Sequence, residues 1–189
     1  MVRAHPWVDA ENDATCRYYD FTQAPQLIRT SLEDFKAFKD HAFTDEFYAM
    51  LLELNQPNNA LESNDCAFVG PHANANAMIA RSLQSWGRLM ILFRHLPHNI
   101  LLGNTEWIAA ELHRYLHRCD TGFLDGMIGT TIVPVHFLAL GTGHRQQAGF
   151  QLLISFWAWG NSEKKIMKNT HRVITNLSLA IRHLSAVAA

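Results

Sequence analysis

The amino-acid sequence predicts an all-α fold, a single-domain helical bundle of five to seven helices with one long ordered loop. Apolar residues recur at helical spacing in several segments, and residues that favour helix N-termini precede those segments. A third observation is the segment 145–158, which is apolar nearly all round a helix and is typical of a buried one. The alternative is an α+β fold, with a short strand near 88–93 or 130–137.

The length of 189 residues corresponds to one domain, long enough to bury a core without disulfides or a structural metal. Residues 1–30 contain Pro6 and Pro25 and show no sustained periodicity, so we expect an N-terminal arm followed by a single helical domain over 31–189. Charged residues make up only 17% of the chain and the net charge is −1. No overall basic field therefore favours nucleic acid or an anionic membrane as a partner.

Ser31 is expected to begin the first helix, and Thr44 a second helix or a continuation of the first. Asp34 follows Ser31 as a capping-box partner, and Asp45 lies in the first turn of the second helix, where the helix dipole favours acidic side chains. The apolar stripe of this second helix consists of Phe43, Phe47, Met50, Leu51 and Leu54.

The segment 55–76 changes the pattern, because it is rich in Asn and contains Pro57 and Pro71. We predict a long ordered loop that folds back onto the body of the protein. Periodicity resumes over 77–94. Within this segment the apolar run 89–93 is either a buried helix or a short buried strand, since periodicity cannot separate the two.

Two more helices are predicted from their first residues. Asn104 or Thr105 caps the earlier one, which ends near His117. The last helix begins at Asn161 or Ser162 and has the clearest amphipathic pattern in the chain. Its stripe consists of Ile166, Thr170, Val173, Ile174, Leu177, Ala180, Ile181 and Leu184.

The cysteine pattern and the hydropathy predict a cytoplasmic protein. Cys16, Cys66 and Cys119 form no CxxC pair, which excludes a zinc ribbon and a thioredoxin-like motif, and a sparse odd set is typical of a reducing compartment. The first residues lack the apolar segment of a signal peptide, and no run reaches the roughly 18 apolar residues that span a membrane. The low charge and the apolar segment 145–158 predict a homodimer.

A metal site is predicted from the spacing of His113 and His117. Residues four apart on a helix lie one above the other, so the two imidazoles can hold one ion. Glu106 lies on the same strip of the helix, and two histidines with one carboxylate form a set suited to iron or zinc. The competing interpretation, which the pattern favours, is an exposed polar face opposite the apolar residues of the helix.

His136 lies in an apolar run with no charge near it in sequence. A buried imidazole needs a partner on at least one nitrogen, and a backbone carbonyl is the most frequent one. The functional alternative is a haem ligand or a ligand to a non-haem metal, because an apolar, aromatic-rich pocket with one neutral histidine suits haem.

Arg94, Trp157 and Trp159 are candidate substrate-binding residues. Arg94 follows an apolar run and can bind a carboxylate through two hydrogen bonds, although a salt bridge to one of the acidic residues is the more frequent role. The two tryptophans can form the wall of a site for a flat aromatic ligand, or they can simply pack in the core.

Asp65, Cys66 and His72 are the catalytic candidates in the predicted loop. Cys66 can act as a nucleophile with His72 as its base. The structural interpretation, in which Cys66 is a small buried apolar residue and Asp65 forms a turn, is preferred.

These patterns together predict a small metal- or haem-dependent oxidoreductase that acts on an aromatic or planar small molecule. Histidines would bind iron or haem, with zinc as a second choice of metal, and Arg94 would orient an acidic group of the substrate. Motifs for phosphate binding and for α/β-hydrolase or HExxH chemistry are absent from the sequence. The alternatives are a non-catalytic helical interaction protein, such as an inhibitor, immunity factor or regulatory subunit, and a cofactor-free enzyme that uses Cys66.

Overall fold

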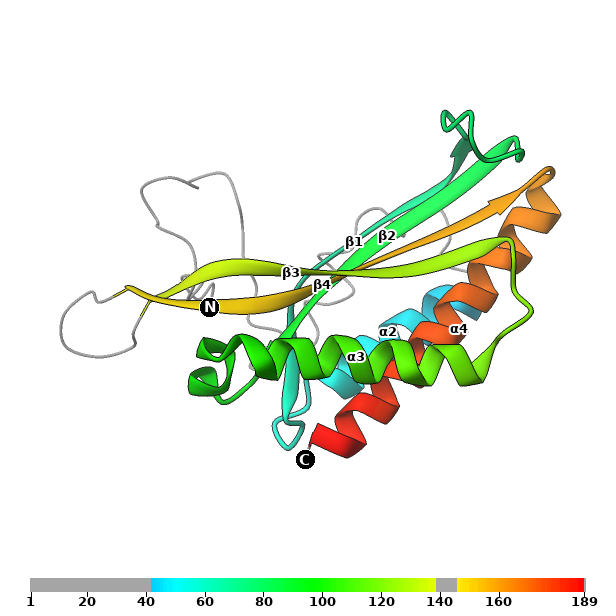
Figure 1. The fold of residues 1–189 in the computed structure, drawn as a ribbon. Helices are drawn as coiled ribbons and strands as arrows, with labels where there is room; N and C mark the ends of the chain where they lie inside the picture. Colours follow the sequence, from blue (N-terminus) through cyan, green and yellow to red (C-terminus); the bar gives the residue numbers. More distant parts are fainter. Residues whose placement is uncertain (1–41, 139–145, 189) are drawn as a thin grey trace.

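The fold is described from a computed structural model, which defines residues 42–138 and 146–188 (Figure 1). The predicted arm over 1–30 and the predicted helix from Ser31 lie outside these residues. In chain order the described elements are α2 (Ala42–Leu54), β1 (Leu61–Ala73), β2 (Leu83–Phe93), the 3-10 helix η2 (Leu96–Ile100), α3 (Leu102–Cys119), β3 (Gly126–Leu138), β4 (Gln146–Gly160) and α4 (Glu163–Ala188).

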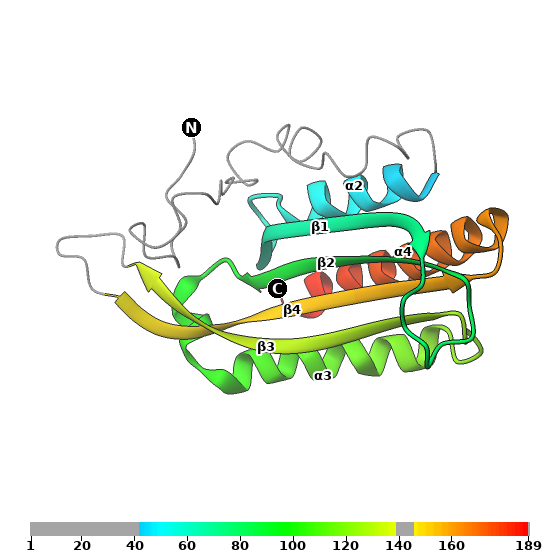
Figure 2. The same ribbon diagram turned by 90° about the horizontal axis from the view of Figure 1, so that it is seen from above.

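The architecture is α+β, so the all-α prediction is wrong and its α+β alternative is confirmed. The four described strands form one antiparallel sheet in the order β1-β2-β4-β3. The chain makes two hairpins, each followed by a helix, and the three described α-helices lie on the same face of the sheet (Figures 1 and 2). Both segments that the alternative assigned to a strand lie in strands, in β2 and β3, which are longer than expected.

Strand β4 stands where a buried helix was predicted at 145–158. Its side chains alternate, with Leu152, Ile154 and Phe156 buried under the helices and Leu153 and Trp157 half-buried on the opposite face. Both faces of this central strand carry apolar residues, so the alternation of apolar and polar residues that identifies a strand is missing. A continuous apolar run of this kind does not distinguish a helix from a buried strand.

Strand β1 occupies most of the segment predicted as a long loop at 55–76. Its register with β2 shifts between Ser63 and Asp65 and again between Val69 and His72. A bulge interrupts the ladder and a proline removes a backbone donor, so both make the pairing of a strand irregular. The prediction of a long loop was therefore wrong for most of this segment, because its Asn and Pro residues, which are typical of turns, belong partly to an irregular strand.

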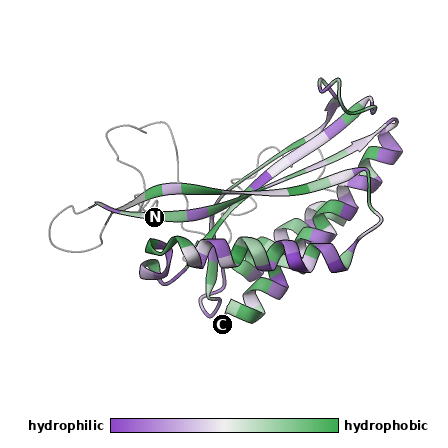
Figure 3. Cartoon of the chain, in the orientation of Figure 1, coloured by the Kyte–Doolittle hydropathy of each residue, from purple (hydrophilic) through white to green (hydrophobic). Residues whose placement is uncertain are grey.

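The three helices predicted near Thr44, Asn104 and Asn161 are present as α2, α3 and α4. The predicted starts of the first two are wrong, since α2 begins at Ala42 and α3 at Leu102, with Leu101 as its N-cap. Every residue of the stripe predicted for the last helix is buried. In Figure 3, hydrophobic and hydrophilic residues interchange along α3 and α4, as expected for helices that cover one side of a sheet. Among the described residues, no helix has the length and the apolar character needed to cross a membrane.

The core lies between the sheet and the helices and is centred on aromatic rings. Phe68 and Phe156 stack with ring centroids 6.4 Å apart, and Phe47 of α2 lies 6.0 Å from Phe156. All three side chains are fully or almost fully buried. Aromatic pairs at these distances add about 0.5–1.5 kcal/mol beyond the burial of their surface.

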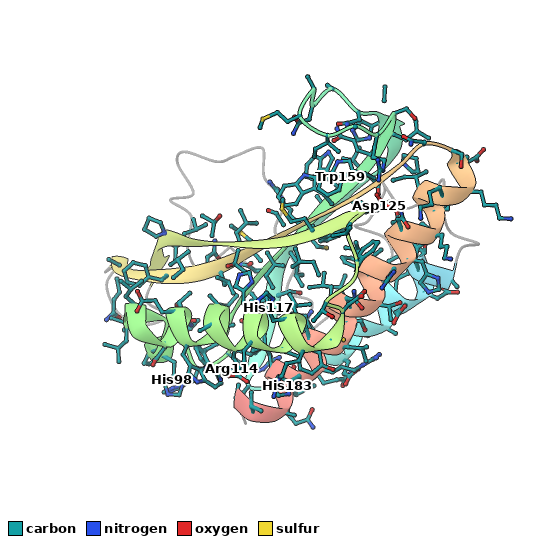
Figure 4. The ribbon with its side chains drawn as sticks, turned by 45° about the vertical axis from the view of Figure 1, so that its right-hand side comes forward. His98, Arg114, His117, Asp125, Trp159 and His183 are labelled. Atoms are coloured by element: carbon teal, nitrogen blue, oxygen red, sulfur yellow. The ribbon has the colours of Figure 1, made fainter. Side chains whose placement is uncertain are left out.

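Asp125 joins three segments at the opposite end of the sheet from the hairpin tip of β3 and β4. Its carboxylate accepts a hydrogen bond from Arg81 Nε at 2.8 Å and lies 3.4 Å from Lys165 Nζ of α4. Its backbone carbonyl accepts a hydrogen bond from the amide of Trp159, 2.9 Å away, and both residues are labelled in Figure 4. Burial acts to raise the pKa of Asp125, but the hydrogen bonds from Arg81 and Lys165 outweigh it and lower the pKa.

We predict that Gly87→Ala destabilises the protein by about 1–3 kcal/mol, the usual cost of overpacking a core. A Cβ atom at position 87 would lie 2.3 Å from the ring of Phe156 and 2.7 Å from the carbonyl oxygen of Ala67, and neither group can move away freely. Urea denaturation measures the change. Gly103→Ala in α3 is the matched control: its Cβ would meet nothing within 4 Å, so a gain of about 0.5–1 kcal/mol is expected. Equal effects of the two substitutions would contradict the packing argument.

Candidate functional site

A cavity of about 440 Å³ lies between α3, the first residues of β3 and α4. Its apolar lining comes from Leu116, Phe123, Met127, Ile128 and Val173. Its polar lining comes from His113, Arg114, His117, Asp120 and Asn176. The cavity is open to solvent along α3, because His113, Arg114 and His117 are exposed.

Asp120 and α4 form one end of the cavity. The Asp120 carboxylate accepts hydrogen bonds from Arg172 Nε and from Asn176 Nδ2, both at 2.7 Å. The hydrogen bond from Arg172 is the main cause that lowers the pKa of Asp120 below its ordinary value of 3.8. Arg172 also lies over the ring of Phe123, 4.5 Å from its centroid. The carboxylate of Asp120 therefore lines the cavity as an ion pair with Arg172 and is not available as a free base.

Glu111 holds Arg114 at the rim. Glu111 is 8% exposed, accepts a hydrogen bond from His183 Nε2 of α4 at 3.0 Å, and also pairs with Arg114. The hydrogen bond from His183 lowers the pKa of Glu111, with Arg114 acting in the same direction. Figure 4 shows Arg114 beside His183. The ring of Tyr115 stacks on that of His183 at 4.7 Å, which fixes the histidine.

His113 and His117 line this cavity one helical turn apart. His113 Nε2 lies 2.8 Å from Thr130 Oγ1 of β3. Within the described residues, His117 has no hydrogen-bond partner, and Figure 4 shows it on α3 below the strands. The helical spacing thus brings the predicted pair together, at a surface that also faces β3.

The third residue of the predicted metal set is not part of this cavity. Glu106 lies about 10 Å before His113 along the helix axis, at a rise of about 1.5 Å per residue. Among residues 42–138 and 146–188, no three His, Cys, Asp or Glu side chains are grouped closely enough to hold a metal ion. His136 belongs to β3 by its backbone, but its side chain lies outside what the structure describes.

The side chain of Arg94 is hydrogen-bonded to the backbone of the segment that precedes β1. Its guanidinium donates hydrogen bonds to the carbonyl oxygens of Asn59 and Gln56, at 2.8 and 2.9 Å, and lies 3.0 Å from Glu62. These contacts fix the connection between α2 and the sheet. They leave Arg94 far from the cavity in the fold, at the end of β2.

The catalytic candidates Asp65, Cys66 and His72 lie along β1. Cys66 is half-buried and packs against the core, whereas His72 lies next to Gln84, with 3.0 Å between its Nε2 and Gln84 Nε2. Six residues of strand separate Cys66 and His72 by about 20 Å, so the structure does not form a dyad from them. The side chain of Asp65 is outside the described part of the structure.

Trp157 and Trp159 lie on the face of β4 that points away from the helices. Trp157 is directly opposite Trp86 of β2, and its ring would lie 3.8 Å from a Cβ atom at Gly129 of β3. Trp159 is 8% exposed, and its indole N–H has no partner among the described residues. The two tryptophans are therefore together, but they do not line the cavity.

Sequence reasoning missed Phe123, Asp120 and Asn176. Nothing in the sequence connects Asp120, just after α3, with Arg172 and Asn176, which lie more than fifty positions later. The one available signal was the spacing of Arg172 and Asn176, four apart on the polar side of the last helix.

Comparisons with models of protein families, with curated proteins and with solved structures found no match to this chain. A function must therefore be argued from the chemistry of the site itself.

We predict that the stability contributed by Asp120 is present above about pH 4 and is lost as the pH falls through its lowered pKa. The lowered pKa means that folding favours the ionised carboxylate, so protonation removes that contribution. Asp120→Asn should therefore lower the free energy of unfolding at pH 6, and its difference from the wild type should shrink at pH 3. Urea denaturation at the two pH values measures this. Glu106→Gln, which changes an exposed carboxylate of the same helix, serves as control, and a pH-independent effect of Asp120→Asn would contradict the argument.

Proposed function

We propose that this protein is a binding module whose cavity takes a ligand group with an apolar body and a negative charge. The observation that carries the proposal is the cavity of about 440 Å³, whose apolar lining lies beside Arg114 and His117. Among the described residues, His117 has no hydrogen-bond partner. Its volume falls in the range of about 300–1,000 Å³ that is usual for small-ligand sites.

The charges around the cavity favour an anionic group. The carboxylate of Asp120 is neutralised by Arg172, so it does not repel an anion. The side chain of Arg114 is 61% exposed. It can turn toward a ligand without leaving Glu111 unpaired, because His183 also binds that carboxylate. Arginine binds carboxylates and phosphates through two parallel hydrogen bonds, which gives this group its selectivity.

The oxidoreductase with iron or haem stays a prediction. Its strongest support is the shared cavity of His113 and His117, and a third ligand would have to come from a partner, a substrate or residues outside the described ranges. Binding without redox chemistry needs none of these, so it is the function that the geometry favours. A binding module agrees with the non-catalytic alternative that the sequence suggested, except that the fold is α+β and not all-helical.

We predict that Arg114→Gln weakens the binding of 1-anilinonaphthalene-8-sulfonate, an aromatic sulfonate, by about tenfold, because a charge-assisted hydrogen bond is lost. Fluorescence titration of the folded protein at pH 7 measures the dissociation constant. Ala110→Trp, which places an indole at the rim of the cavity, is expected to have the same effect.

Arg118→Gln is the matched control, because Arg118 is an exposed arginine of the same helix that does not line the cavity. Its dissociation constant should equal that of the wild type. The proposal fails if Arg114→Gln and Ala110→Trp bind the sulfonate as tightly as Arg118→Gln does.

A further inference from the structure

Strand β3 forms an edge of the described sheet, and its backbone groups can be assigned a direction. The amide of Trp159 donates to the carbonyl of Asp125, and the register pairs Gly126 with Ala158. Asp125 and Trp159 are therefore a hydrogen-bonded pair. In an antiparallel ladder such pairs alternate with pairs that exchange no hydrogen bond.

The alternation places the free backbone groups on the even-numbered residues of β3. These residues direct their N–H and C=O groups away from β4, and they are Gly126, Ile128, Thr130, Ile132 and Pro134. Among the described residues, no hydrogen bond reaches these outward groups. Pro134 has no N–H, so it closes this edge for further pairing at one end. The stretch from Gly126 to Ile132 carries no proline and no charged residue.

An open edge of this kind is unusual in a natural sheet. Proteins commonly protect edge strands with charged side chains, bulges or prolines, because an unpaired edge is a template for another strand. β1, on the other side of the described sheet, has two shifts of register, whereas β3 pairs with β4 without a shift over its whole length. The regular edge of β3 is therefore suited to accept a strand.

Helix α3 runs beside this edge, as Figure 2 shows, and the cavity lies between them. Gly126 and Ile128 line the cavity from the strand, and His113 and His117 line it from the helix. Any segment that paired with β3 would lie along the mouth of the cavity. Since successive side chains of a strand point to opposite faces, every second side chain of such a segment would point into the cavity.

We propose that the ligand of this site is an extended polypeptide segment that adds a strand to the free edge of β3 between Gly126 and Ile132 and inserts an acidic side chain into the cavity. This inference rests on the proposed function, because the cavity selects the side chain. The main-chain hydrogen bonds supply affinity, and the cavity supplies specificity, as in other cases of strand addition. The acidic residue meets Arg114 and His117, and the intervening side chains point to the opposite face of the sheet.

The test begins with selection of binders from a display library of random linear dodecapeptides, with the full chain as bait. Amide hydrogen exchange is then measured with and without the selected peptides. The expected result is that peptides are selected, that they are enriched in Asp or Glu, and that the amides of Gly126, Ile128, Thr130 and Ile132 become protected. The inference is overturned if no peptide is selected, or if selected peptides leave those amides exchanging as before.

Thr130→Pro removes one outward N–H and leaves the ladder with β4 intact. It should weaken the selected peptides by about tenfold, the effect of a lost hydrogen bond that leaves its partner unsatisfied. Thr130→Val is the matched control, since it loses the contact with His113 but keeps the N–H. If Thr130→Pro does not fold, N-methylation of alternate peptide amides gives the same information. Methylation in one register should abolish binding, whereas methylation in the other should leave it unchanged, and equal effects in both registers would contradict the inference.

The sulfonate probe separates this inference from the proposed function. If the sulfonate binds in an Arg114-dependent way but no peptide protects the edge, strand addition fails and the cavity proposal stands. If peptides protect the edge and Arg114→Gln leaves both ligands unaffected, the cavity proposal fails, and with it the insertion of an acidic side chain, whereas the addition of a strand to β3 stands. The four amides could also be protected without any peptide and lose this protection on dilution. That result would show that a second copy of the chain occupies the edge, and it would overturn the inference.

Discussion

At the centre of the sheet, the ring of Phe156 fills the space that a side chain at position 87 would occupy, 2.3 Å from an ideal Cβ. Gly87 lies between Phe68 of β1 and Phe156 of β4 in the register of the sheet, so the two rings can stack across β2. Phe47 of α2 packs against Phe156. Helices α2 and α4 cover this side of the sheet, and their buried residues account for most of the core. The location of the core on one face of the sheet follows from this contact.

Helix α3 is held differently. Ile108 and Leu112 reach the core, and Tyr115 and Leu116 pack against its border. Two polar contacts add to this by joining the second half of α3 and the residue after it to α4, Glu111 with His183 and Asp120 with Arg172. Such polar contacts can fix the position of α3 relative to α4 even where side chains do not fill all the space beside the helix. The space that remains between α3 and β3 is the cavity, and the exposed histidines of α3 border it. The site is thus a consequence of how α3 is fastened.

The sequence predicted the helices well and the strands poorly, for one physical reason. Helices α2, α3 and α4 cover one side of a sheet, so each has an apolar stripe of period 3.6 that is visible in its residues. Strand β4 is apolar on both faces and β1 is interrupted by shifts of register, so neither shows a regular period of two. The spacing of His113 and His117 predicted their proximity because it depends on the helix alone. The positions of Arg94 and Cys66 depend on strand pairing, which their local sequence does not encode.

The free edge of β3 belongs to a third category, a property of topology. Whether a strand lies at the edge depends on the order of the strands. In the described sheet, β4 pairs with β2, and β3 therefore lies outside β4. Pro134 is the one local sign of this position, since a proline inside a sheet is confined to strands whose outward N–H has no partner. The same order places the first residues of β3 across the cavity from α3, which also packs on β4. Within the described structure, an edge that no other strand covers and a cavity bordered by Arg114 therefore adjoin because of one topological choice. A ligand that uses both must be a chain with a backbone as well as a side chain.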